Sequence, residues 1–108
     1  MIEATYYRDM HKLIVRGHAR SDEPGKDLVC ASASILTYTF GKAVAEFESS
    51  GSVRDASVMI DEGNAEISCN PKNGMRHVVT LVLDSICGGF TLLSKSKPEF
   101  ISFRIAQK

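Results

Sequence analysis

Short segments in which apolar and polar residues alternate open the chain. Residues 2–7 and 12–19 are rich in Ile, Val, Thr and Tyr, and a short polar link separates them. A period of two with β-branched and aromatic side chains is typical of strands that bury one face. The pattern predicts a β-hairpin, followed by a polar loop over 20–26 that contains Pro24-Gly25.

The pattern then changes to helical spacing. From Asp27 to about Ser50, large apolar side chains recur at intervals of three and four residues, which predicts a helix with one apolar face. Asp27 suits the helix start, where a carboxylate accepts backbone N–H groups and meets the positive end of the dipole. The residues expected on the apolar face are Leu28, Ile35, Leu36, Phe40, Ala43 and Phe47.

The second half of the chain repeats a hairpin and a helix. Residues 53–61 and 65–70 alternate in polarity around a turn with the sequence Asp-Glu-Gly-Asn. Helical spacing returns over 75–93, where Gly88-Gly89 indicates either a close packing point or an early helix end. Residues 99–106 read as a final strand.

The resulting order, β-β-α-β-β-α-β, predicts a single α+β domain over residues 1–108. Hairpins joined to helices favour an antiparallel or mixed sheet with two helices packed on it. The hydrophobic share of 44% and the charged share of 24% are typical of a globular domain with its own core.

Composition and charge also narrow the function classes. No apolar run approaches the ~20 residues of a membrane-spanning helix, and the first residues lack the pattern of a signal peptide. We therefore expect a cytoplasmic protein without membrane contact. Thirteen basic and thirteen acidic residues balance, which argues against direct nucleic-acid binding because that requires a basic face.

The three cysteines are expected to be free thiols, because their number is odd and no signal sequence precedes them. No CxxC pair is present and the histidines are scattered, so we expect neither a metal site nor a cofactor. Cys69 lies on the same face of its predicted strand as Ala65 and Ile67, and Cys87 lies in the apolar second helix. Both are therefore predicted to be core residues. His11 in a turn and His77 on a helix are expected to be solvated.

Cys30 differs from the other two thiols. It lies at the edge of the apolar face of the first helix, near the helix start, where unpaired N–H groups and the dipole stabilise a thiolate. His18 precedes the polar loop, so a short span of chain could bring its imidazole alongside as an acid–base partner. One Cys and one His at this spacing fit a structural role for Cys30 as well as a catalytic one. The direction of the His18 side chain is also open, because strand parity does not place it with the buried residues.

Two short blocks of sequence carry a resemblance to a known family. Gly17-His18-Ala19 and the block GKDLVCASAS, which ends at Ser34, follow the pattern GHA and G-x-D-[IL]-V-C-A-x-x-S. This pattern resembles that of the ribosomal-processing cysteine protease Prp family, and the separation of 12 residues between His18 and Cys30 is similar. Beyond these blocks the resemblance is one of length and element order.

The resemblance implies roles for several residues. Cys30 would be the nucleophile and His18 the base, while Asp27 and Ser34 match supporting polar residues and Gly17 an invariant glycine. A mobile segment that covers the site in the family corresponds to Arg20, Ser21, Asp22, Glu23, Pro24, Gly25 and Lys26.

The resemblance also implies a function and partners. The chain would be a homodimeric cysteine endopeptidase that removes the N-terminal extension of a large-subunit ribosomal protein during ribosome assembly. Two alternatives remain at this point: a non-catalytic ribosome-associated binding module, and a redox sensor that uses the Cys30 thiol. The second is disfavoured because no resolving cysteine lies near Cys30 in the sequence.

Overall fold

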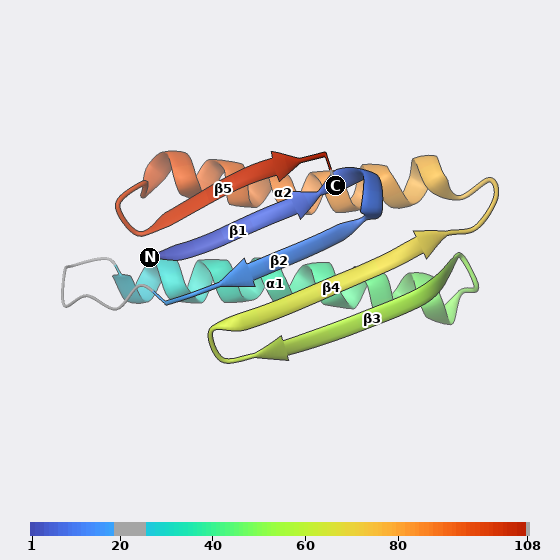
Figure 1. Cartoon of the computed structure of the whole chain (residues 1–108), viewed down its shortest axis with the longest axis horizontal. Coiled ribbons are helices and arrows are strands. Elements are labelled where there is room, and N and C mark those ends of the chain that lie inside the picture. The colour runs from blue at the N-terminus through green and yellow to red at the C-terminus, as the bar shows by residue number, and fades with distance from the viewer. Residues whose placement is uncertain (19–25, 108) are drawn as a thin grey trace.

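The computed structural model describes residues 1–18 and 26–107 and shows one sheet with two long helices on the same face (Figure 1). This arrangement confirms the predicted α+β fold and its element order. The elements are β1 (Ile2–Tyr7), the 3₁₀ helix η1 (Arg8–Met10), β2 (Lys12–Arg16), α1 (Lys26–Ser49), β3 (Val53–Asp61), β4 (Asn64–Pro71), α2 (Arg76–Ser96) and β5 (Ile101–Ala106).

The sheet is mixed, with the strand order β3-β4-β2-β1-β5. Strands β1 and β5 run parallel, whereas the other neighbouring pairs are antiparallel. Strand β2 is central and lies between β1 and β4. In Figure 1 its end, the start of α1 and the β3–β4 turn lie at the same end of the molecule.

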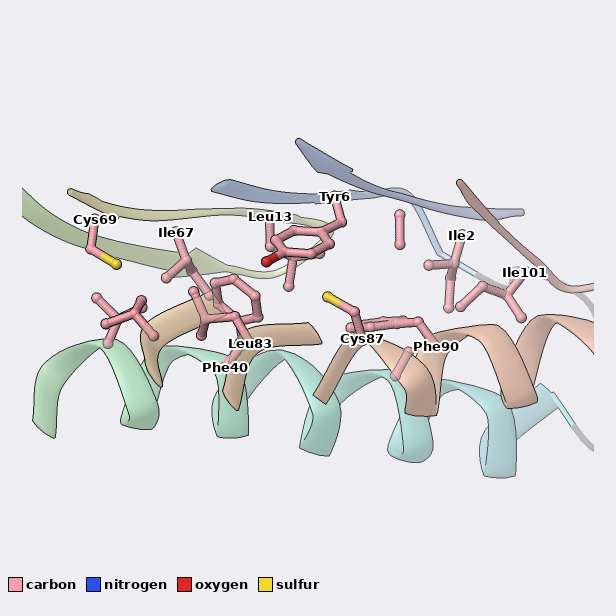
Figure 2. Close-up of a cluster of buried hydrophobic side chains, with 14 of the residues drawn as sticks. Ile2, Tyr6, Leu13, Phe40, Ile67, Cys69, Leu83, Cys87, Phe90 and Ile101 are labelled. Carbon is pink, nitrogen blue, oxygen red and sulfur yellow. The ribbon is translucent and has the colours of Figure 1, made fainter. Parts of the chain in front are cut away.

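The core fills the space between the sheet and the helices (Figure 2). Alternate residues of β1 point into it, and Tyr6 meets Phe40 of α1 edge to face with ring centroids 5.9 Å apart. Cys69 on β4 and Cys87 on α2 are both buried in this core, which confirms the prediction for these two thiols.

The predicted apolar face of α1 is partly wrong. Leu28 and Ile35 are 66% and 63% exposed, so they point away from the sheet. Small residues take their place: a Cβ added to Gly41 would lie 3.2 Å from Val58 Cγ1, so the helix backbone comes close to β3. The other four predicted residues, Leu36, Phe40, Ala43 and Phe47, do contact the core. The fully buried residues of the helix are Val29, Ala33, Thr37, Phe40, Gly41 and Val44.

Helix α2 runs without interruption through Gly88-Gly89. A Cβ added to Gly89 would lie 2.5 Å from Leu36 Cδ2 on α1. Gly89 is therefore a close packing point between the two helices, and the alternative of an early helix end is wrong.

Both long helices are apolar enough to cross a membrane when only length and composition are considered. The expectation that no apolar segment is long enough to span a membrane was therefore wrong. One or two such helices are weak evidence of membrane insertion, and here both helices pack along one face of the sheet (Figure 1).

His11 is buried, which contradicts the prediction that it is solvated, whereas His77 is exposed as predicted. The His11 backbone is left-handed, with a φ of 50°, and its Nε2 forms a hydrogen bond of 2.8 Å with Thr80 Oγ1. This turn conformation directs the ring beneath α2. Burial lowers the pKa of His11, and the nearby Arg76 guanidinium acts in the same direction.

The burial of His11 predicts a pH-dependent stability. Because the folded-state pKa is lowered, the unfolded chain binds more protons below about pH 6.5. The free energy of unfolding therefore falls as the pH drops from about 6.5 through the folded-state pKa. His11→Asn, in which Asn tolerates the left-handed backbone, should remove this part of the fall, and urea unfolding at about pH 7.5 and 5.5 measures it. The exposed His77→Asn is the control; equal pH slopes in both variants would contradict the prediction.

Candidate active site

Strand β2 ends in a turn that only glycine fits. Gly17 has a φ of 93°, a conformation that L side chains rarely adopt. Its N–H donates a hydrogen bond of 3.0 Å to the carbonyl oxygen of Gly63 in the β3–β4 turn. A Cβ at Gly17 would lie 2.4 Å from the carbonyl oxygen of Met1. The chain therefore leaves the sheet between two constraints, the hydrogen bond to Gly63 on one side and the Met1 carbonyl oxygen on the other.

His18 lies directly after this turn and is half-buried. Its carbonyl oxygen accepts a hydrogen bond of 2.9 Å from the Met1 ammonium group. Its imidazole lies over the β3–β4 turn, because a Cβ added to Gly63 would be 2.3 Å from Nε2. The direction that strand parity left open is thus toward the neighbouring hairpin.

Cys30 lies on α1 and packs its half-buried side chain against the core. The described helix begins at Lys26, one residue before the predicted start, so Cys30 is its fifth residue. Its own N–H therefore lies just beyond the unpaired N–H groups of a helix start. Side chains on a helix lean toward its N-terminus, which directs the thiol back toward those groups.

The structure brings Cys30 and His18 to one cavity of about 330 Å³. The two residues come from different elements, α1 and the end of β2, and both line the cavity wall. Gly17 and Ser34 also line it, whereas Asp27 does not and is exposed at the helix start. The remaining lining residues are Ile2, Val15, Ala33, Thr37, Tyr38, Ile60, Asp61, Glu62, Gly63, Asn64 and Ala65.

The β3–β4 turn is a part of the cavity wall that sequence reasoning did not assign to the site. Asp61, Glu62, Gly63 and Asn64 all line the cavity, and Gly63 contacts the imidazole of His18. In the sequence these residues have the ordinary composition of a hairpin turn. Nothing in the spacing connects them to a motif far away in the chain, so no sequence signal could have found them.

The predicted mobile segment lies largely outside the described residues. Arg20, Ser21, Asp22, Glu23, Pro24 and Gly25 are not described, and Lys26 is the half-buried first residue of α1. Within residues 1–18 and 26–107, no group of three or more His, Cys, Asp and Glu side chains could hold a metal ion.

Solved structures share this fold. The crystal structure of SMU.848 from Streptococcus mutans has a TM-score of 0.70 and 28% sequence identity, and the match covers 97% of this chain and 93% of that one. An essential ribosomal processing protease Prp from Staphylococcus aureus, in complex with a substrate peptide, has a TM-score of 0.67 and 20% identity. The same protease with a covalently linked product peptide has a TM-score of 0.67 and 22% identity. Each Staphylococcus aureus match covers 97% of both chains.

Sequence comparison identifies the family. No match was found among curated proteins. The family described as cysteine protease Prp matches residues 1–102, which include both motif blocks and all strands except the last part of β5. On this match over nearly the whole chain, the protein belongs to the cysteine protease Prp family.

Proposed function

We propose that this protein is a cysteine endopeptidase with Cys30 as its nucleophile and His18 as its acid–base partner. The observation that supports the proposal is the cavity that both side chains line, although they come from different elements. Membership of the Prp family supports the same chemistry. A non-catalytic binding module would need neither the thiol nor the imidazole on the cavity wall.

The proposed reaction has two halves. The Cys30 thiolate attacks the carbonyl carbon of the scissile peptide bond, and the carbonyl electron pair moves to oxygen. When this tetrahedral intermediate collapses, the C–N bond breaks and the His18 imidazolium protonates the leaving amine. The N-terminal fragment stays on Cys30 as a thioester, until water attacks that carbonyl with His18 as base and restores the thiol. Backbone N–H groups near the helix start would stabilise the oxyanion, a contribution of about 3 kcal/mol per donor in comparable sites.

The supporting residues differ in how they would act. Ser34 lies one helical turn beyond Cys30 and lines the cavity, so its hydroxyl can bond a peptide group of the substrate. Asp27 does not line the cavity. It lies in the first turn of α1, where its negative charge interacts favourably with the positive end of the helix dipole. Asp27 would therefore support the helix start rather than contact the substrate.

We propose that the substrate is the N-terminal extension of a large-subunit ribosomal protein, cleaved in the cytoplasm during ribosome assembly. The Staphylococcus aureus protein is described as a ribosomal processing protease and was solved with a substrate peptide, which supports a peptide substrate here. The apolar side chains of Ile2, Val15 and Ile60 on the cavity wall suit an apolar residue of such a peptide.

We also propose that two copies form a homodimer. Large apolar side chains are exposed on the surfaces of α1 and α2 that point away from the sheet. Exposed apolar patches on a protein surface often mark a protein–protein contact, which supports the proposal. The exposed residues on these surfaces are Leu28, Ile35, Val78, Leu81 and Leu92.

Alanine variants test the catalytic roles. Cys30→Ala and His18→Ala should each reduce cleavage of the extended ribosomal protein by at least about 1,000-fold, because both halves of the reaction need them. Mass spectrometry of the protein's N-terminus after incubation measures the cleavage. Cys69→Ala is the matched control, and it should keep activity while losing about 1–3 kcal/mol of stability as a buried truncation. Cleavage retained by pure Cys30→Ala, with binding unchanged, would contradict the assignment.

Alkylation tests the reactivity of the three thiols. Burial raises the pKa of Cys69 to about 11 and, together with the Asp84 carboxylate, that of Cys87 to about 12. Since only the thiolate reacts, less than about 1% of either thiol is reactive at pH 8. Cys30 lines an open cavity and should be labelled first by iodoacetamide, as peptide mapping after a brief exposure would show. Labelling led by Cys69 would refute this order.

A further inference from the structure

We infer that Gly63, in the β3–β4 turn, is a positioning residue that holds the His18 imidazole in the cavity. The position of the imidazole can be tested without any catalytic activity. Only the expected effect on turnover rests on the proposed function. Gly63 lies 45 positions after His18 in the sequence, outside both motif blocks. It would act through His18 and not on the substrate itself.

The first argument is the space that a side chain at residue 63 would occupy. A Cβ built on Gly63 would lie 2.3 Å from His18 Nε2 and 3.0 Å from both Cδ2 and Cε1. Real Cβ atoms essentially never lie within 3.0 Å of heavy atoms from residues that are not their chain neighbours, so the ring would have to shift. The imidazole therefore fills the volume that every other residue type would need for its side chain.

The second argument is the backbone that carries the ring. The Gly17 N–H donates to the Gly63 carbonyl oxygen at 3.0 Å, directly after the last β2–β4 pair, Arg16 with Asn64. The His18 carbonyl oxygen accepts from the Met1 ammonium group at 2.9 Å. Hydrogen bonds therefore hold the backbone before and after the His18 Cα, at the Gly17 N–H and at the His18 carbonyl oxygen. The imidazole lies against the β3–β4 turn, the same turn that accepts the hydrogen bond from Gly17.

A side chain at residue 63 would therefore move the ring rather than the backbone. The imidazole can rotate about its two side-chain bonds, whereas residues 17 and 63 are joined by a main-chain hydrogen bond. A catalytic group displaced by about 1 Å loses about 100-fold in rate. The expected signature is a lower kcat with a smaller change in KM, because the added side chain displaces the imidazole while the main chain of the cavity wall stays in place.

Gly63→Ala and Gly74→Ala form a matched pair for the test. Both glycines have a positive φ, 74° and 85°, so alanine strains the backbone at either position. No described atom lies within 4 Å of a Cβ at Gly74, so that variant carries the strain without the collision. Gly63→Asn is the second variant, because Asn tolerates a left-handed backbone and keeps the turn folded while still adding a Cβ.

Two readouts separate this inference from the proposed function. In the wild-type chain, nuclear Overhauser contacts should connect the ring protons of His18 to the Hα protons of Gly63, and they require no activity. Gly63→Ala and Gly63→Asn should each lower kcat by about 100-fold, while Gly74→Ala stays within about 3-fold of wild type. Missing Overhauser contacts in the wild type, or unchanged kcat in the folded Gly63 variants, would overturn the inference. Overhauser contacts in a wild-type protein that cleaves no peptide would instead refute the proposed function.

Discussion

The hydrogen bond from the Gly17 N–H to the Gly63 carbonyl oxygen joins the end of the central strand to the turn of the neighbouring hairpin. It extends the β2–β4 ladder by one step, to a residue whose positive φ then directs the chain out of the sheet. The carbonyl oxygen of Met1 leaves no room for a side chain at this position. His18 consequently leaves the sheet over Gly63, on the cavity wall that Cys30 shares.

The other side of the cavity depends on how closely α1 approaches the sheet. Ala33 and Gly41 lie on the buried face of the helix, and the absence of bulk at Gly41 allows contact with Val58 and Ile60. Cys30 and Ser34 lie beside this face in the first half of α1, and both line the cavity. Core packing and site geometry are therefore coupled, since a bulkier residue on the buried face would displace the thiol as well.

The sequence was sufficient to predict the element order, because alternation and helical spacing depend on which residues contact the core. It failed where small residues decide the packing: Leu28 and Ile35 were assigned to the buried face of α1, whereas Ala33 and Gly41 occupy it. His11 was missed because a left-handed turn directs its ring beneath α2.

The residues of the candidate site could be proposed from the sequence, but their arrangement could not. The spacing of His18 and Cys30 resembles a family motif, and the cavity brings the two residues together. Strand parity could not orient His18, because β2 ends at Arg16 and Gly17 changes the chain direction. The contribution of the β3–β4 turn depends on strand pairing between distant segments, which local spacing does not encode.

We propose that Cys30 forms a covalent bond with the substrate in the cavity that it shares with His18. The most direct measurement is intact-mass spectrometry of the protein after acid quenching during turnover of a peptide that spans the cleavage site, followed by peptide mapping. The expected result is a thioester with the mass of the N-terminal fragment, located on Cys30 and absent from Cys30→Ala. Cleavage without any such adduct, or an adduct on Cys69 or Cys87, would contradict it.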